Sequence, residues 1–225
     1  MIPQLSKDAI SDRIARNVAR MIDAETDTCL VNLGIGFPSL VASYITNPNV
    51  YLHAENGIVG IRSLSPEEAP HPMLINAGRF PLGEAPGCFY VDSSLSFGLI
   101  RGGHVDITVL GALEVDEEGN VANWIIPNGK QLGVGGAMDL VAGANRVIVA
   151  MGHTVNGKSR LLKTCTLPIT GHGEVDDLVT EFANFSFGGG RPVLREIAPD
   201  ITLDELRGIT EFDFDVSPDC GTLIA

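Results

Sequence analysis

The sequence is poor in basic residues, with 15 Lys and Arg against 28 Asp and Glu and a formal charge of −13. A chain with this balance offers little attraction to a polyanion, which argues against nucleic acid and anionic membranes as partners. No apolar run approaches the roughly 18 residues that span a bilayer. Residues 1–4 show neither the basic nor the apolar segment of a secretory leader. We therefore expect a cytoplasmic protein without membrane association.

Cysteine is also scarce. Cys29, Cys88, Cys165 and Cys220 lie far apart, with no Cys-x-x-Cys or Cys/His spacing. This pattern predicts neither a metal site nor a disulfide framework, and we expect four reduced thiols that are mostly buried.

What the chain does have is apolar content: 44% of its 225 residues are hydrophobic, enough for one sizeable core. No internal repeat, linker or low-complexity segment divides it. Strand and helix patterns alternate, so we expect a single α/β domain over residues 1–225. Its predicted fold is an open, mostly parallel sheet with helices on both faces and β-hairpin additions.

Individual helices and strands can be predicted from the spacing of apolar residues and from capping residues, glycines and prolines. Apolar residues at spacings of three and four predict a first helix, which Ser6 is placed to cap. The expected helices are 6–21, a short one from Pro38, 93–100, 136–142 and one opened by a Thr202-x-x-Glu205 capping box. The expected strands are 28–33, 50–53, 105–110 and 146–150, with hairpins at 113–115/121–124 and 178–187/193–197. Five prolines make 65–86 mostly loop, with a short strand possible at 73–76.

The first chemistry-bearing motif is Asn32-Leu-Gly-Ile-Gly-Phe-Pro38. Glycines after a strand let a backbone approach a ligand, and the helix start that follows offers free N–H groups to an oxyanion. The same pattern also suits a tight turn without a ligand. A dinucleotide site is disfavoured because Ser39 replaces the third glycine and Pro38 lacks an N–H.

The second motif is Glu55-Asn56-Gly57 at the end of a strand. Open α/β sheets place ligand crevices there, and an ionised carboxylate can attack an activated acyl group without a general base. A solvated carboxylate that caps the turn is the alternative. The third motif, Gly133-Val-Gly-Gly136, runs into a helix and suits either close approach of a thioester or a simple connection.

Together these motifs resemble the B (β) subunit of family I coenzyme A-transferases, near the acetate, butyrate–acetoacetate and 3-oxoacid enzymes. The resemblance runs from Ile14 to Glu181 and is looser after Phe182. It is carried by VNLGIGFP, ENGIVG, LINAG, DSSLSFGLIRGGHVDITVLGALEVDEEGNVANWIIP, GGAMDLV and KTCTLPITG.

The resemblance assigns roles to particular positions. It implies that Glu55 is the covalent nucleophile and that Asn32 contributes to the oxyanion site. Gly34, Gly36 and Asn56 join the oxyanion and substrate set. The turn that closes on the enzyme thioester corresponds to Gly135, Gly136 and Ala137.

Arg79, in the predicted loop, is a candidate for the substrate carboxylate because a guanidinium fork suits carboxylates; a solvated arginine is the alternative. The chain departs from the family pattern at Ala54, where Ser is usual, at Val134, where Met is usual, and at Lys130-Gln131-Leu132, where Lys-Met is typical. We expect His53, His104 and His153 to be packing or hydrogen-bonded histidines.

The implied activity is ping-pong transfer of coenzyme A between an acyl-CoA and a short-chain or 3-oxo carboxylic acid, through a glutamyl-CoA thioester. Coenzyme A is then a substrate, and no cofactor or metal is expected. The implied partner is a CoA-transferase A (α) subunit in an A₂B₂ heterotetramer. The alternative functions are a decarboxylase of a CoA ester and a catalytically silent binding subunit on the same fold.

Overall fold

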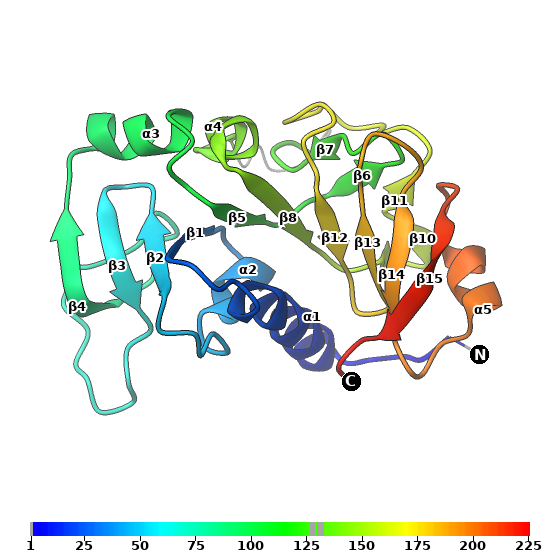
Figure 1. Cartoon of the computed structure of the whole chain (residues 1–225), viewed down its shortest axis with the longest axis horizontal. Coiled ribbons are helices and arrows are strands. Elements are labelled where there is room, and N and C mark those ends of the chain that lie inside the picture. Colours follow the sequence, from blue (N-terminus) through cyan, green and yellow to red (C-terminus); the bar gives the residue numbers. More distant parts are fainter. Residues whose placement is uncertain (1, 127–128, 130–132) are drawn as a thin grey trace.

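The computed structural model describes residues 2–126, 129 and 133–225. Met1 and the Lys130-Gln131-Leu132 departure lie outside them. A ten-stranded sheet runs through the described chain in the order β15-β14-β13-β12-β8-β5-β1-β2-β3-β4 (Figure 1). Its strands are β1 (Cys29–Leu33), β2 (Val50–Ala54), β3 (Ile58–Arg62), β4 (Gly83–Tyr90), β5 (Ile107–Leu110), β8 (Arg146–Ala150), β12 (Asp177–Val179), β13 (Ala183–Ser186), β14 (Val193–Ile197) and β15 (Asp215–Thr222).

The middle of this sheet is parallel and its flanks are mixed. Strands β12, β8, β5, β1 and β2 pair in parallel. On one side β3 and β4 continue antiparallel, and on the other β13 and β14 do so before β15 joins β14 in parallel. The predicted open, mostly parallel sheet is therefore confirmed.

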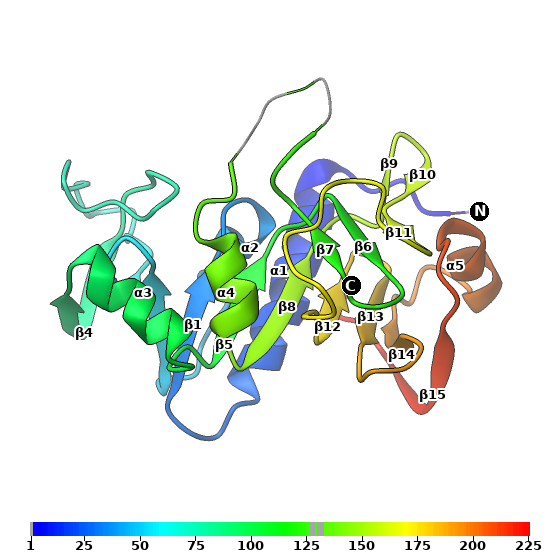
Figure 2. The same ribbon diagram turned by 90° about the horizontal axis from the view of Figure 1, so that it is seen from above.

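Helices cover both faces of the sheet (Figures 1 and 2). They are α1 (Lys7–Asp23), α2 (Phe37–Val41), α3 (Ser93–Arg101), α4 (Ala137–Gly143) and α5 (Leu203–Ile209). Ile14 and Val18 of α1 share one core cluster with Ile148 of β8. The other cluster joins Ile100 of α3 to Val147. Successive residues of a strand point to opposite faces, so alternate positions of β8 serve the two clusters.

Local signals in the sequence begin the helices as expected. The Ser6 side chain accepts a hydrogen bond from the N–H of Ala9 at 3.2 Å. The Thr202 and Glu205 side chains form the predicted reciprocal capping box. Helix α3 is capped by Asp92, whose side chain accepts from the N–H of Leu95 at 2.8 Å. None of the described helices is long and apolar enough to cross a membrane.

The predicted first hairpin is present and belongs to a small separate sheet. That sheet consists of β6 (Glu114–Asp116), β7 (Val121–Ala122) and β11 (Leu161–Leu162), with β6 and β7 antiparallel. A further two-stranded hairpin is formed by β9 (Thr154–Val155) and β10 (Lys158–Ser159).

Some boundaries differ from the prediction. The segment 178–187 is not one hairpin arm: the chain turns back at 180–182, so β12 pairs with β13, and β13 then pairs with β14. The proline-rich stretch ends earlier than expected because β4 already begins at Gly83. Pro86 is accommodated there because β4 is the edge of the sheet, where a missing N–H costs no ladder bond. No strand forms at 73–76, where only an isolated bridge joins Ile75 to Pro81.

The expectation for the cysteines is met in part. All four are free thiols, but only Cys29 is buried and the other three are half-buried.

Candidate active site

Glu55 lies in the turn between β2 and β3, directly after the last residue of β2. The turn is closed by a hydrogen bond from the N–H of Gly57 to the Ala54 carbonyl at 2.9 Å. Gly57 has φ +117°, and a Cβ at this position would lie 2.1 Å from the Val91 carbonyl oxygen. Only glycine therefore permits this turn, which leaves the Glu55 side chain half-buried.

Asn32 lies beside this carboxylate because β1 and β2 pair in parallel with Asn32 opposite His53. Its side chain is fully buried. The Asn32 amide Nδ2 lies 3.3 Å from Glu55 Oε2 and 3.2 Å from the His53 carbonyl oxygen. Since both of these atoms only accept, the amide must present its N–H groups to them. Asn32 is thus oriented to donate to the carboxylate of Glu55.

His53 and Ser96 extend this hydrogen-bond network on the buried side of Glu55. The Ser96 hydroxyl donates to the Glu55 carbonyl oxygen at 2.8 Å and lies 2.9 Å from His53 Nε2. Because the Ser96 proton is committed to the carbonyl, the Ser96 oxygen accepts from a protonated Nε2. His53 Nδ1 then carries the lone pair and faces the Asn32 amide at 3.4 Å.

Burial keeps this histidine neutral: desolvation lowers the pKa of His53 to about 4. His53 is 1% exposed. The imidazole therefore adds no positive charge beside the carboxylate at neutral pH.

The glycine turn before α4 also comes close to Glu55. A Cβ placed on Gly136 would lie 3.4 Å from Glu55 Cγ and 3.3 Å from two ring carbons of Phe97. The N–H of Gly136 forms no hydrogen bond with another described residue, whereas that of Ala137 donates to the Val134 carbonyl at 3.0 Å. Within the predicted turn, Gly136 therefore faces the Glu55 side chain, and its N–H has no partner among the described residues.

Two cavities meet at Glu55. The first, called here the aliphatic cavity, has a volume of about 300 Å³ and runs between α2, β2 and β3. The second, the glycine cavity, has a volume of about 580 Å³ and is lined by 34–37, 110–113 and 133–137. Glu55, Gly34, Ile35 and Ala77 line both. A carboxylate at such a junction has room for one group of a substrate on each side.

The remaining predicted residues take different positions. Gly34 lines both cavities, but its N–H is committed to the Val109 carbonyl at 2.8 Å. Gly36, with φ +88°, and Gly135, with φ +52°, line the glycine cavity. Asn56 is exposed, and its amide donates to the Ile75 carbonyl at 2.9 Å, which ties the long loop to the Glu55 turn.

Arg79 is exposed, has φ +64° and lines neither cavity. Of the three departures from the family pattern, the two within the described residues face the site: Ala54 lines the aliphatic cavity and Val134 the glycine cavity. Within 2–126, 129 and 133–225, no group of three or more His, Cys, Asp or Glu side chains is placed to hold a metal ion.

A model of the coenzyme A transferase family matches residues 14–208. The chain belongs to this family. Among curated proteins it is 48% identical over 208 residues to the beta subunit of an acetate CoA-transferase from Haemophilus influenzae, covering 92% of each chain. It is 46% identical over 204 residues to the B subunit of a probable succinyl-CoA:3-ketoacid coenzyme A transferase from Bacillus subtilis, covering 90% of this chain and 94% of the other. The predicted resemblance and the prediction of a CoA-transferase are confirmed.

Solved structures share the fold at lower identity. An acyl-CoA transferase from Escherichia coli O157:H7 has a TM-score of 0.73 at 20% identity, and the match covers all of this chain and 45% of that longer chain. A variant of the decarboxylase AibA/AibB has a TM-score of 0.71 at 20% identity, covering 95% of this chain and 88% of the other. At these identities the matches establish the predicted fold alone.

The sequence reasoning missed the role of Ser96. The sequence gives little sign of this role, because a serine in the first turn of a helix is ordinary and the partners of Ser96 lie about 40 residues away in the sequence. His53 was expected to be hydrogen-bonded, and that is confirmed. The structure additionally shows that its partners are the residues around the nucleophile.

Proposed function

We propose that this chain is the nucleophile-bearing B-type component of a CoA-transferase that moves coenzyme A between acyl groups by a ping-pong mechanism. The observation that carries the proposal is Glu55 at the junction of two cavities, with the Asn32 amide at 3.3 Å and Gly136 so close that an added Cβ would lie 3.4 Å from Glu55 Cγ. A carboxylate beside an amide donor, with an unpartnered backbone N–H nearby, can act as a nucleophile whose transition states are stabilised by those donors.

In the first half-reaction a Glu55 oxygen attacks the thioester carbonyl and the C–S bond breaks. The CoA thiolate departs, and the acyl group and Glu55 are then joined in an acyl-glutamyl anhydride. The thiolate then attacks the γ-carbonyl of Glu55. The anhydride C–O bond breaks, the donor acid leaves as a carboxylate, and Glu55 is a glutamyl-CoA thioester. An acceptor carboxylate runs the same steps in reverse. No electrons are gained or lost, so we propose coenzyme A as a substrate and no metal or redox cofactor.

Each of these steps develops an oxyanion at a carbonyl beside Glu55. The Asn32 amide N–H and the free N–H of Gly136 are the donors that we assign to it. Because the anionic centres are alike, one fixed pair of donors can serve every step. His53 and Ser96 act through Asn32 and through the backbone of Glu55, which makes them positioning residues.

We further propose an A-type partner chain, assembled with this one as A₂B₂. Among the described residues that line the two cavities, Arg62 is the single Lys or Arg, and it is paired with Glu68. The phosphates of coenzyme A therefore need cations from elsewhere. Two apolar side chains flank Gly78 near the shared part of the cavities and are exposed in the isolated chain: Ile35 is 63% and Phe80 54% exposed. Exposed apolar surface of this kind marks a surface that a partner covers.

The test is reconstitution. Purified alone, the chain should bind coenzyme A poorly and transfer nothing; co-expressed with an A-type partner, it should transfer coenzyme A from an acyl-CoA to a free acid. Light scattering of the complex should give the mass of two copies of each chain. Robust transfer by the chain alone would refute the partner requirement, and CO₂ release from a CoA ester without transfer would favour the decarboxylase alternative. The cytoplasmic location stays a prediction.

A further inference from the structure

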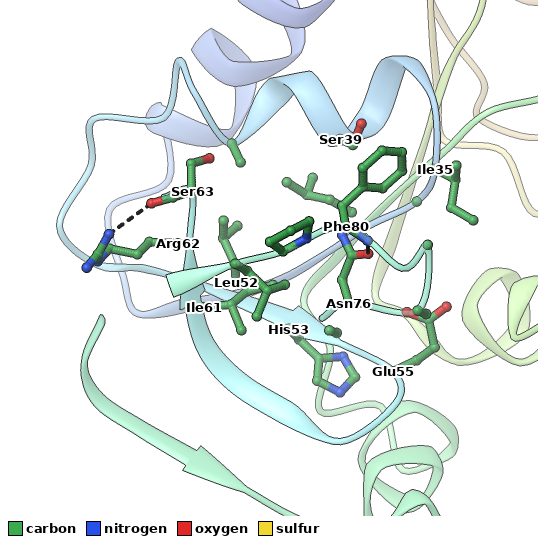
Figure 3. A pocket seen from close by; sticks show the side chains of 18 of the residues that line it. Ile35, Ser39, Leu52, His53, Glu55, Ile61, Arg62, Ser63, Asn76 and Phe80 are labelled. Carbon is green, nitrogen blue, oxygen red and sulfur yellow. Dashed lines mark hydrogen bonds between the residues drawn. The ribbon is translucent and has the colours of Figure 1, made fainter. Parts of the chain in front are cut away.

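The aliphatic cavity leads away from Glu55 between apolar side chains (Figure 3). Glu55 and Ile35 lie on one side of the view, Arg62 and Ser63 on the opposite side, and Leu52 and Ile61 between them. Its aliphatic walls include Leu33, Leu40, Leu52, Ile61, Pro81 and Leu82. A group attached to the carbonyl carbon that Glu55 attacks can extend along these walls, while the sulfur side of the substrate occupies the glycine cavity.

Several polar atoms that border this cavity already have partners, whereas the neutral donors Ser63 Oγ and Asn76 Nδ2 have none among the described residues. The Ser39 hydroxyl donates to the Gly36 carbonyl at 2.7 Å. Asn76 Oδ1 accepts from the N–H of Phe80 at 3.0 Å. His53 is held neutral between Ser96 and Asn32, as described above. None of these groups offers a positive charge to a ligand.

Among the described residues that line the cavity, Arg62 is the one cation, at the far end, and four of its five N–H donors are occupied. Its Nη1 and Nη2 fork the Glu68 carboxylate at 2.6 and 2.5 Å. Its Nε donates to the Glu84 carbonyl and Nη1 also to the Ser63 carbonyl, both at 3.0 Å. Four hydrogen bonds thus use a guanidinium that has five N–H donors. The Arg62 guanidinium lowers the pKa of this carboxyl to about 2, so the pair is ionised at neutral pH and its charges offset each other.

We infer that the aliphatic cavity is the acyl subsite and that it selects hydrocarbon acyl chains over chains that end in a second carboxylate. This inference rests on the proposed function and adds the substrate class. A second carboxylate extending along the cavity reaches aliphatic walls, an arginine that is already paired with Glu68, and at most the neutral donors of Ser63 and Asn76, so it loses hydration without gaining an unpaired cation. A terminal methyl group has no such hydration to lose, and it gains apolar contact with the cavity walls.

Butyryl-CoA and succinyl-CoA are a matched pair for this test, because both carry four-carbon acyl chains and differ in a terminal methyl against a carboxylate. With the assembled two-component enzyme and one fixed acceptor, we expect kcat/KM for succinyl-CoA to be lower by on the order of 100-fold. From acetyl- to butyryl-CoA, kcat/KM should rise by roughly fourfold for each methylene buried. Equal or greater kcat/KM with succinyl-CoA would overturn the inference.

Substitutions at two positions, Ile61 and Arg62, probe the wall and the far end of the cavity. Ile61→Phe should move the preferred chain length to shorter acyl groups and Ile61→Ala to longer ones, because Ile61 lines the cavity. The same substitutions at Ile45, which is also half-buried but lines none of the four described pockets, are the controls. An unchanged chain-length preference in both Ile61 variants would contradict the subsite. Arg62→Gln should leave the ratio of butyryl to succinyl transfer within about threefold, and a selective loss of succinyl transfer would show that Arg62 binds a second carboxylate.

These outcomes separate the inference from the proposed function. If the assembled enzyme accepts no acyl-CoA at all, the proposed function fails. If it transfers coenzyme A and prefers succinyl-CoA, only the assignment of the acyl subsite fails. The wild-type substrate series decides between these results even where a variant does not fold.

Discussion

Replacing Gly136 with valine places a branched side chain between Phe97 and the nucleophile. The Cβ alone would lie 3.3 Å from two Phe97 ring carbons and 3.4 Å from Glu55 Cγ, which is tight contact without severe overlap. The two valine methyl groups extend about 1.5 Å further, so the Glu55 side chain has to move by about 1 Å. A misplacement of about 1 Å costs on the order of 100-fold in rate. Valine keeps the backbone N–H, but its methyl groups crowd this donor, and displacing one oxyanion donor costs about 100- to 1000-fold.

We therefore expect Gly136→Val to lower kcat/KM by about 100- to 1000-fold. The backbone tolerates the change, because Gly136 has φ −88° and ψ 4°. Gly136→Ala should cost less than about tenfold, since only the Cβ is added. Gly188→Val is the control, at an exposed glycine with no atom within 4 Å of an added Cβ. Steady-state kinetics of the assembled enzyme, with melting temperature and complex mass as checks, measure the effect. A Gly136→Val enzyme that assembles normally and works within about twofold of wild type would refute the reasoning.

Three further predictions concern the turn and the network behind Glu55. Gly57→Ala should lower the free energy of unfolding, measured by urea denaturation, by about 2–4 kcal/mol, because Gly57 has a φ of +117° and an added Cβ would lie 2.1 Å from the Val91 carbonyl oxygen. The control Gly208→Ala, where an added Cβ has no atom within 4 Å, should not lower it. Burial lowers the pKa of His53 to about 4 from 6.5, so the unfolded chain binds a proton that the folded chain refuses, and stability falls as the pH drops from about 6.5 towards 4. Between pH 7 and pH 5, the free energy of unfolding should therefore fall by about 2 kcal/mol less in His53→Gln than in wild type. Equal falls in the two proteins would contradict this. Asn32→Asp, which puts a second carboxylate at the amide position 3.3 Å from Glu55, should lower kcat by more than about 100-fold and shift the acid limb of the pH–rate profile upward.

The central part of the fold could be predicted because its signals are local. The first helix has an apolar period and a capping serine, and both appear in α1 as Ser6 and the buried Ile14 and Val18. The buried parallel strands are short apolar runs, and β5 and β8 lie within or at the predicted bounds. These elements can be recognised from their own residues, without knowing which strands or helices they pack against.

The last two strands at one end of the sheet, β3 and β4, could not be predicted because their signals depend on pairing. Strand β3 follows the Glu55 turn and contains Gly60, and β4 contains Pro86 and Gly87, which all argue against a strand in isolation. A Cβ on Gly60 would lie 3.0 Å from Cys88 Cα, so this glycine serves the close approach of the two strands. Only the partner strand explains the residue.

For the site, the sequence identified the residue types and the structure supplied their relation. Glu55, Asn32 and Gly136 were singled out by strand ends, glycine turns and the family resemblance, and the fold brings all three together. The sequence could not show that Asn56 ties down the long loop, that Arg79 lines neither cavity, or that Ser96 and His53 orient the amide. These depend on contacts between segments that are distant along the chain.

The central claim is that Glu55 forms a thioester with coenzyme A, and mass spectrometry of the assembled enzyme tests it most directly. After incubation with an acyl-CoA and no acceptor, the account predicts a coenzyme A adduct that borohydride reduces and that peptide mapping places on Glu55. The Glu55→Gln enzyme should carry no adduct and transfer no coenzyme A. An adduct on another residue, or full activity in Glu55→Gln, would contradict the account.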